Sequence, residues 1–225
     1  MKKYAVIVAG GSGQRMGVAM PKQFLLLQGK PLLWYTLTAF LEAFEDIHII
    51  LVLPAENISE VDSLVKDLYA EEKITVTVGG KTRFHSVQNG LALVTDPSIV
   101  FVHDGVRCLV TKDLIQRCYN QAVAEGSAVP AIAATDSIRI IKGNSHEVAD
   151  RNHVRIIQTP QTFQSAVLLK AFKTDYKDSF TDEATVVEAS GAQVFLIEGE
   201  HENIKITRPA DLLIAERILA ERLSL

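Results

Sequence analysis

The chain has 225 residues, of which 48% are hydrophobic and 22% charged, and its formal net charge is −4 at pH 7. This length and composition are typical of one sizeable globular domain. The net negative charge provides no positively charged surface for binding nucleic acid, and we do not expect nucleic acid as a partner. No stretch is long and apolar enough for a membrane span, so we do not expect a membrane as a partner either. The two cysteines, Cys108 and Cys118, make no disulfide framework and favour a reducing, cytoplasmic compartment.

Apolar runs alternate with amphipathic segments along most of the chain. In chain order, the patterns predict strand 4–8, helix 31–44, strand 47–53, helix 59–69, strand 74–78, helix 83–94, strand 99–103, helix 112–125, strand 128–133, strand 192–197 and helix 207–223. Thr111 is a suitable helix cap before residue 112, and Gly126 a suitable stop. This alternation predicts an α/β fold with a mostly parallel sheet covered by helices.

The alternation breaks between residues 135 and 161. Residues 137–142, a turn at Gly143-Asn144, and a return through Val148 to Ile157 predict a β-hairpin arm that stands off the sheet. An isolated hairpin is only marginally stable, so such an arm usually covers something or grips a partner. With no repeat or linker elsewhere, we expect a single domain over residues 1–225 that carries this arm.

The first predicted strand runs into a glycine-rich loop, residues 10–17, that precedes Pro21-Lys22. Glycines let the backbone N–H groups approach an anion, and Arg15 and Lys22 add positive charge beside them. The spacing misses the dinucleotide fingerprint by one residue, and no Gly-Lys-Ser/Thr triplet follows. The loop therefore favours a polyphosphate ligand, with a plain strand-to-helix turn as the alternative.

Two other polar segments also follow predicted strands. Residues 79–86 form a second glycine turn that opens a helix, where N–H groups are available to a ligand. Asp104 and Arg107 follow the strand at 99–103 and suit sugar hydroxyls and a phosphate, with an internal ion pair as the alternative. The carboxyl ends of parallel strands share one edge of a sheet, so we expect all three segments to meet there.

Eight ordered motifs then carry a family resemblance over nearly the whole chain. They are residues 9–17, 21–25, 79–87, 102–107, 150–151, 158–163, 181–184 and 203–207. In this order they resemble the 2-C-methyl-D-erythritol 4-phosphate cytidylyltransferases of the non-mevalonate isoprenoid pathway. The resemblance implies a Rossmann-like fold, a homodimer interlocked by the arm, and Mg²⁺-dependent transfer of a cytidylyl group from CTP to the sugar phosphate.

The resemblance also implies roles for individual residues. Arg15 and Lys22 match the pair that stabilises the transition state, and Arg151 and Lys205 match the pair that positions the sugar phosphate. The residues that match substrate-binding positions are Ala9, Gly10, Gly11, Gly13, Gly80, Lys81, Arg83, Ser86, Asp104, Arg107, Ser137 and Thr159. Gly80, Lys81 and Ser86 fall where the cytosine is read. The ligands of the metal are left open, and the six histidines lack the spacing of a structural zinc site.

Two departures from the family pattern accompany these matches. Gly105-Val106-Arg107-Cys108 stands where the family more often has Ala-Ala-Arg-Pro, and Ser137 stands where threonine is usual. The related ribitol 5-phosphate cytidylyltransferases are the nearest alternative, and the motifs at 83–87 and 181–184 favour the methylerythritol enzymes over them. More distant alternatives are a non-catalytic CTP-sensing module and an NAD-dependent oxidoreductase.

Overall fold

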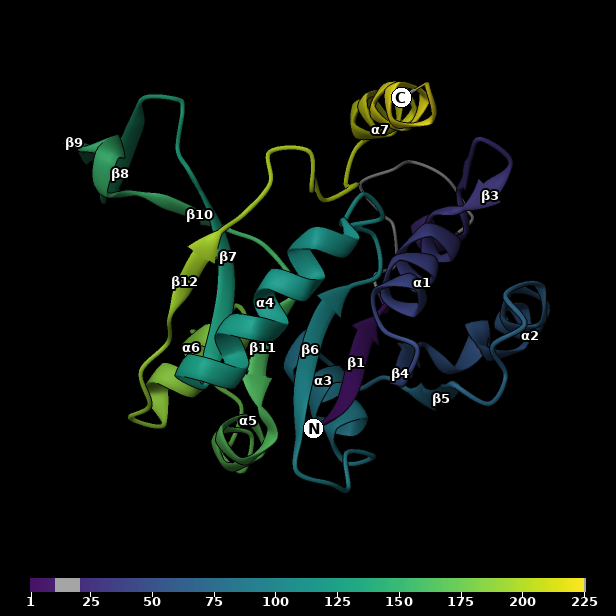
Figure 1. Ribbon diagram of the computed structural model, residues 1–225. Coiled ribbons are helices and arrows are strands. Elements are labelled where there is room, and N and C mark those ends of the chain that lie inside the picture. Colours follow the sequence, from purple (N-terminus) through teal and green to yellow (C-terminus); the bar gives the residue numbers. More distant parts are fainter. Residues whose placement is uncertain (11–20, 225) are drawn as a thin grey trace.

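A central β-sheet organises the protein, whose computed structural model describes residues 1–10 and 21–224 (Figure 1). Within these residues the strands of the sheet are β1 (Lys2–Val8), β4 (Ile47–Leu53), β5 (Ile74–Val78), β6 (Ser98–Asp104), β7 (Ser127–Ala133), β10 (Arg155–Ile157), β11 (Gln161–Gln164) and β12 (Leu196–Glu198). Their order is β10-β7-β11-β6-β1-β4-β5, with β12 paired to β7.

The half of the sheet around β1 is parallel, as predicted. β1 pairs in parallel with both β4 and β6, and β4 pairs in parallel with β5. β11 is antiparallel to its neighbours β6 and β7, and β10 is antiparallel to β7. The carboxyl ends of β1, β4, β5 and β6 consequently lie at the same edge, where an open α/β sheet binds its ligands.

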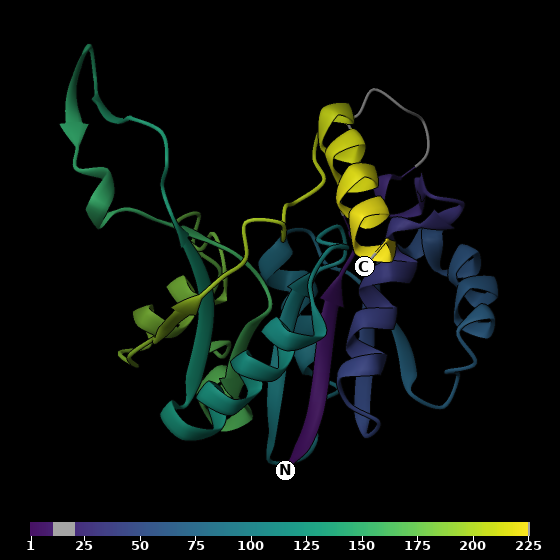
Figure 2. The ribbon, with the colours of Figure 1, turned by 45° about the horizontal axis from the view of Figure 1, so that its top comes forward.

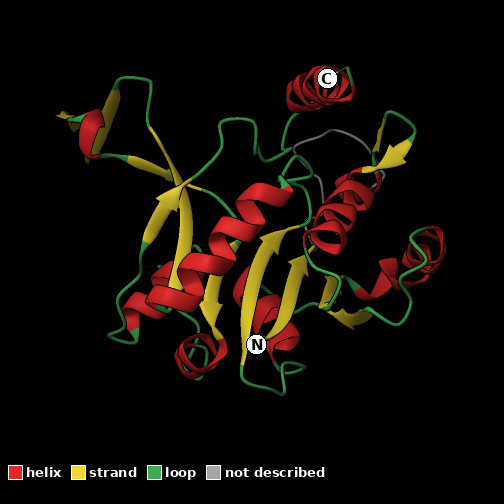
Figure 3. Cartoon of the chain, viewed as in Figure 1, coloured by secondary structure: helices red, strands yellow, loops and turns green. Residues whose placement is uncertain are grey.

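Helices cover both faces of the sheet (Figure 3). They are α1 (Leu32–Ala43), α2 (Ile58–Asp67), α3 (Arg83–Leu91), α4 (Lys112–Glu125), α5 (Ser165–Ala171), α6 (Glu183–Ala189) and α7 (Pro209–Leu223) within the described chain. One apolar core joins α1, α2 and α4 to the sheet, and a second joins α3, α5 and α6 to its other face. A third, smaller core packs α7 against the segment after β6.

Local sequence explains the elements that the patterns predicted well. β4 and β5 have the predicted bounds, because each is a run of mostly apolar or β-branched residues closed by proline or glycine. In α4 the hydroxyl of Thr111 accepts the N–H of Leu114 at 3.1 Å, and Gly126 ends the helix with φ of 92°. That left-handed conformation favours glycine. Short 3-10 turns lie at Lys22–Phe24, Ala55–Asn57 and Arg151–His153, and β2 (Leu26–Leu27) pairs with β3 (Lys30–Pro31).

The arm is a two-stranded ribbon that extends away from the sheet (Figure 2). β8 (Ile138–Lys142) and β9 (Ser145–Ala149) flank the predicted turn at Gly143-Asn144. The predicted return strand is partly wrong, because residues 155–157 leave the arm and join the central sheet as β10. Three apolar side chains of the ribbon, Ile140, Ile141 and Val148, are 47%, 70% and 68% exposed. Ile141 and Val148 share one face and Ile140 lies on the other, and none of the three is buried by the described chain.

The other corrections concern short elements. The strand expected at 192–197 is confined to Leu196–Glu198. β11, α5 and α6 were not predicted, because they are only four and seven residues long and carry buried polar side chains. Among the helices of the described residues, none has the length and apolar character that crossing a bilayer requires.

Candidate active site

A cavity of about 300 Å³ opens at the carboxyl ends of β1 and β6, beside the turn that precedes α3. The three polar segments predicted to meet at this edge of the sheet all reach it. The described residues that line it are Val8, Ala9, Gly10, Lys22, Gln23, Gly80, Lys81, Thr82, Arg83, Ser86, Asp104, Val106 and Lys205. The cavity thus collects nine of the predicted site residues, from motifs spread over most of the chain.

The turn between β5 and α3 is held rigidly on one side of the cavity. The hydroxyl of Ser86 accepts the N–H of Gly80 at 3.0 Å and donates to the carbonyl of Thr82 at 3.0 Å. A Cβ on Gly80 would lie 2.4 Å from the Cβ of His85, so no other residue fits without moving the helix. The turn therefore presents its backbone groups to the cavity in a fixed arrangement, as precise placement of polar groups around a ligand requires.

Asp104, which lines the cavity, lies at the centre of a charged cluster. Its Oδ1 accepts Arg83 Nε at 3.1 Å, its Oδ2 pairs with Lys205 Nζ at 2.8 Å, and Arg107 Nε lies 3.7 Å away. Burial alone would raise the pKa of the Asp104 carboxyl, but these cations outweigh burial and hold the pKa well below its ordinary value. Asp104 is therefore a carboxylate at neutral pH, and it orients two cavity-lining cations.

A buried hydrogen-bond network fixes the end of β6 behind this cluster. Thr159 Oγ1 accepts the backbone N–H of Asp104 at 3.1 Å and lies 2.9 Å from His103 Nδ1. His103 Nε2 lies 3.2 Å from the carbonyl of Arg107, which can only accept, so Nε2 carries the proton and the Thr159 hydroxyl donates to Nδ1. Burial lowers the pKa of His103 to about 3, which keeps the imidazole neutral in this network.

The segment that carries Lys205 is tied to the same place. Asn203 donates its side-chain amide to the carbonyl of Thr159 at 2.9 Å, and Arg107 Nη1 donates to the carbonyl of Asn203 at 2.8 Å. The N–H of Ile206 bonds to the carbonyl of Val106 at 3.0 Å. Lys205 is thereby held between two anchored neighbours, with its ammonium against Asp104.

The charge of the cavity differs in sign from that of the whole chain. Its described lining carries four cations and one carboxylate, in a protein whose formal net charge is −4. The cations are Lys22, Lys81, Arg83 and Lys205. Such a local excess of positive charge suits a polyphosphate ligand. Within residues 1–10 and 21–224, no group of three or more His, Cys, Asp or Glu side chains is arranged to hold a metal ion.

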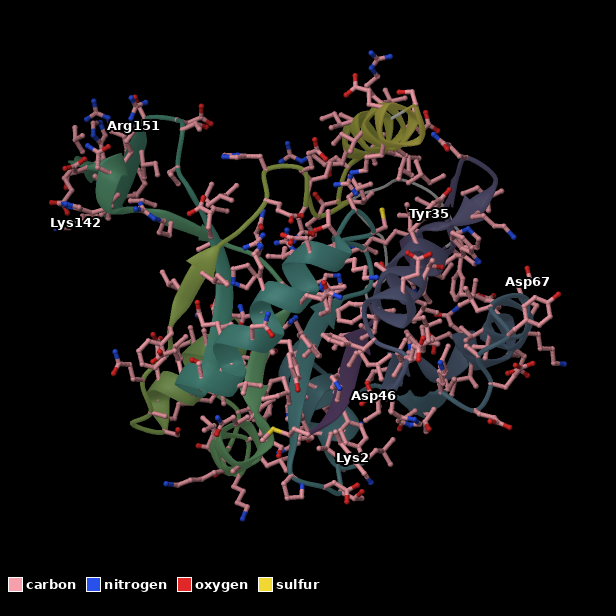
Figure 4. All side chains as sticks on the ribbon, viewed as in Figure 1. Lys2, Tyr35, Asp46, Asp67, Lys142 and Arg151 are labelled. Carbon is pink, nitrogen blue, oxygen red and sulfur yellow. The ribbon has the colours of Figure 1, made fainter. Side chains whose placement is uncertain are left out.

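Four predicted site residues lie away from the cavity lining. Arg107 and Thr159 lie behind it, where their polar groups bond to the protein as described above. Ser137 and Arg151 lie on the arm, where Figure 4 labels Arg151, and Arg151 follows β9 on the segment that returns to the sheet. Ser137 and Arg151 both line a separate, open pocket of about 430 Å³ between the strands of the arm and the turn that follows them. There Arg151 Nη1 donates to the carbonyl of Thr135 at 2.7 Å.

Three further predicted residues, Gly11, Gly13 and Arg15, lie outside the described residues. Four lining residues were not among the predicted site residues: Val8, Gln23, Thr82 and Val106. Their place in the chain could have indicated them, because each is adjacent to, or two positions from, a predicted site residue at a strand or helix end.

Comparison with known proteins decides between the nucleotide-binding classes. The family of 2-C-methyl-D-erythritol 4-phosphate cytidylyltransferases matches the chain over residues 4–221. The chain belongs to this family. Members of this cytidylyltransferase family are nucleotidyltransferases, and the alternatives of a CTP-sensing module and an oxidoreductase receive no support from the match.

Individual relatives agree with the family match over nearly all of their length. A 2-C-methyl-D-erythritol 4-phosphate cytidylyltransferase of Bacteroides fragilis is 44% identical over 219 residues, covering 97% of this chain and 100% of that protein. One from Clostridium botulinum is 36% identical over 219 residues, covering 96% of this chain and 98% of that protein.

Solved structures extend the agreement to the fold. The crystal structure of the 2-C-methyl-D-erythritol 4-phosphate cytidylyltransferase from Thermus thermophilus has a TM-score of 0.76 and 31% identity, covering 98% of this chain and 100% of that chain. The crystal structure of a 4-diphosphocytidyl-2C-methyl-D-erythritol synthase from Anaerococcus prevotii has a TM-score of 0.84 and 26% identity, covering 97% of this chain and 98% of that chain. The predicted Rossmann-like α/β fold class is confirmed.

Proposed function

We propose that this protein transfers the cytidylyl group of CTP to 2-C-methyl-D-erythritol 4-phosphate and releases pyrophosphate. One observation carries the proposal beyond family membership: four cations from separate motifs line one cavity at the carboxyl edge of the sheet. In this reaction a phosphate oxygen of the acceptor forms a bond to the α-phosphorus, and the bond from that phosphorus to the β-phosphate oxygen breaks. The leaving pyrophosphate carries the displaced electron pair.

The reaction needs no nucleophilic side chain, because the acceptor's own phosphate attacks. The protein's task is to align two phosphates and to neutralise the charge that develops between them. We assign charge neutralisation at the α-phosphate to Lys22, and to Arg15 from outside the described residues. We assign the acceptor side to Lys205, which projects beside Asp104 at the cavity.

We assign recognition of the base to the turn at Gly80 and Ser86. Its polar groups are fixed by the Ser86 bonds to Gly80 and Thr82, so they cannot rearrange for a base with a different donor pattern. A rigid polar site rejects a wrong partner strongly because its own groups are then left unpaired. CTP should accordingly be consumed in preference to UTP.

Mg²⁺ fits this site as a companion of the nucleotide. The described lining offers one carboxylate, Asp104, whose two oxygens already contact Arg83 and Lys205. Mg²⁺ is commonly bound through one or two carboxylates together with substrate phosphates. We therefore propose that the phosphates of CTP supply the protein-independent ligands of Mg²⁺, because both oxygens of Asp104 are already engaged by cations of the protein. The ion would neutralise part of the triphosphate charge.

We also propose that the arm joins two copies of the chain into a homodimer and carries Arg151 to the partner's cavity. The support is the three exposed apolar side chains of β8 and β9 together with the position of Arg151, which lies on the arm and not in its own chain's cavity lining. Isologous contact of two such arms would bury these side chains reciprocally.

Subunit exchange tests this arrangement. Inactive Lys22→Ala is mixed with inactive Arg151→Ala under conditions that exchange subunits. A mixed dimer with shared sites has one site with both defects and one with neither, so random exchange should restore about a quarter of wild-type activity. A mixture that stays inactive, with exchange confirmed by native mass spectrometry, would exclude the shared site.

We propose a cytoplasmic location as well. Both cysteines are free and buried, and burial raises the pKa of each thiol to about 12. Free buried thiols are typical of proteins in a reducing compartment. Fractionation of cells that express the tagged protein would locate it, and recovery in a secreted fraction would contradict this assignment.

Pyrophosphate release tests the proposed reaction. Purified protein with CTP, Mg²⁺ and 2-C-methyl-D-erythritol 4-phosphate should release one pyrophosphate for each acceptor consumed, and Lys22→Ala should lower kcat by at least about 10²-fold, the scale of one lost transition-state contact. Lys66→Ala, an exposed lysine on α2, is the matched control. Equal loss in both variants, or equal turnover of UTP and CTP, would contradict the assignment.

A further inference from the structure

A buried ion pair behind the cavity links the motif at 181–184 to the catalytic end of the sheet. Glu183, the first residue of α6, is 1% exposed, and both its carboxylate oxygens accept hydrogen bonds from Arg83. The bond from Arg83 Nη2 measures 3.0 Å. Burial raises the pKa of the Glu183 carboxyl, and Arg83 offsets part of that rise. Because both oxygens accept, the geometry holds the carboxylate form.

Two contacts from outside α6 hold Glu183 in place. Gln161 on β11 accepts the N–H of Ala184 at 2.8 Å and donates to Asp182 Oδ2 at 2.9 Å. Asp182 also caps α6 by accepting the N–H of Thr185 at 2.9 Å. The position of the Glu183 carboxylate is therefore set by the sheet itself, through the neighbour of β6.

The guanidinium of Arg83 divides its donors between two carboxylates. Its Nη1 and Nη2 edge bonds to Glu183, and its Nε donates to Asp104 Oδ1 at 3.1 Å. A guanidinium is planar with donors in a fixed fork, so fixing the Nη edge also fixes the direction of Nε. The Oδ2 of Asp104 is then left for Lys205, at 2.8 Å.

We propose that Glu183 is a positioning residue for the acceptor side of the cavity. It orients Arg83, Arg83 orients Asp104, and Asp104 holds Lys205 where the proposed function needs a cation for the acceptor phosphate. The cluster contains Arg83, Arg107 and Lys205 against Asp104 and Glu183, a net charge of +1. Without the Glu183 charge, Arg83 turns its Nη edge to Asp104 and competes there with Lys205.

This inference deepens the proposed function and rests on it. The kinetic test separates a role of Glu183 in positioning the acceptor side from a general structural role. In Glu183→Gln, the KM for the acceptor should rise about 10-fold, while the KM for CTP stays within about twofold, because the Gly80 turn is untouched; this fold-change is the middle of the range for contacting pairs. Glu188→Gln, an exposed carboxylate on the same helix, is the matched control. Equal changes in both KM values, or no change in a folded Glu183→Gln protein, would overturn the positioning role.

A double-mutant cycle asks whether Glu183 acts through Arg83. If it does, Arg83→Gln combined with Glu183→Gln should have the same kcat/KM for the acceptor as Arg83→Gln alone, within about twofold. Losses that multiply would show that Glu183 acts by another route. Should Glu183→Gln leave Arg83 unpaired and fail to fold, Glu183→Asp keeps the buried charge, withdraws the carboxylate by one methylene, and should raise the KM for the acceptor in the same way.

A readout without turnover keeps this test independent of the proposed reaction. In protein labelled with ¹⁵N-arginine, the Nε–H signal of Arg83 should be protected from exchange with solvent, because this proton is held by a buried carboxylate. Protection should be lost in Glu183→Asp or Glu183→Gln and kept in Glu188→Gln. Protection retained in all variants would overturn the inference, whereas a wild-type protein that fails to turn over CTP would refute only the proposed reaction.

Discussion

Thr159 provides the sharpest stability prediction, because its hydroxyl bonds to two buried groups at once. It accepts the backbone N–H of Asp104 at 3.1 Å and donates to His103 Nδ1 across 2.9 Å, and the side chains of Asp104 and His103 are themselves buried. Thr159→Val preserves the shape of the side chain but leaves both groups unpaired. Each unpaired buried group costs about 1–3 kcal/mol, so the free energy of unfolding should fall by roughly 2–6 kcal/mol.

Thr159→Ser is the matched control, because it keeps the hydroxyl and removes one buried methyl group. That loss should cost about 1 kcal/mol. Urea unfolding of both variants at neutral pH, followed by circular dichroism at equal protein concentration, measures the difference. If Thr159→Val proves no less stable than Thr159→Ser to within about 0.5 kcal/mol, the assignment of these two hydrogen bonds is refuted.

The remaining predictions concern pH and the base turn. Burial lowers the pKa of His103 to about 3 in the folded protein, whereas a histidine in the unfolded chain has a pKa of about 6.5. Between these pH values the unfolded chain binds a proton that the folded protein does not. The contribution of His103 to the free energy of unfolding is therefore complete above about pH 6.5 and is lost as the pH falls. His103→Asn should therefore make the decline of stability between about pH 6 and pH 4 shallower by roughly 1 kcal/mol per pH unit, and an unchanged slope would contradict a neutral buried His103. Gly80→Ala places a Cβ 2.4 Å from that of His85, so the KM for CTP should rise by about 10-fold or more, a displacement worth roughly 1–3 kcal/mol. Lys66→Ala, at the exposed lysine of α2, serves as its comparison in the same assay and should leave the KM for CTP unchanged.

The sequence predicted where the site lies in the fold better than it predicted which side chains line the cavity. Ala9, Gly80 and Asp104 each follow an apolar strand, and parallel strands bring their carboxyl ends to one edge, so their meeting followed from the pattern. Which side chains face the cavity did not follow. Arg107 and Thr159 turn into the protein and bond to backbone and buried groups there, a choice set by the tertiary fold.

The same limit applies to the elements that sequence patterns missed. α6 is short, and its first residue is a buried carboxylate that a periodicity argument assigns to solvent. Glu183 is tolerated there only because Arg83 is its partner, 100 positions earlier in the chain. An ion pair between residues so far apart in the chain produces no pattern in the sequence around either residue. β10 and β11 likewise depend on their neighbours β7 and β6, because three- and four-residue strands carry little pattern of their own.

The choice of acceptor tests the central claim most directly. With saturating CTP and Mg²⁺, pyrophosphate release is measured against 2-C-methyl-D-erythritol 4-phosphate and ribitol 5-phosphate in parallel, and the products are identified by mass spectrometry. The account predicts a higher kcat/KM for 2-C-methyl-D-erythritol 4-phosphate and a product that carries one cytidylyl group joined to that acceptor. A higher kcat/KM for ribitol 5-phosphate, or pyrophosphate release with neither acceptor, would contradict it.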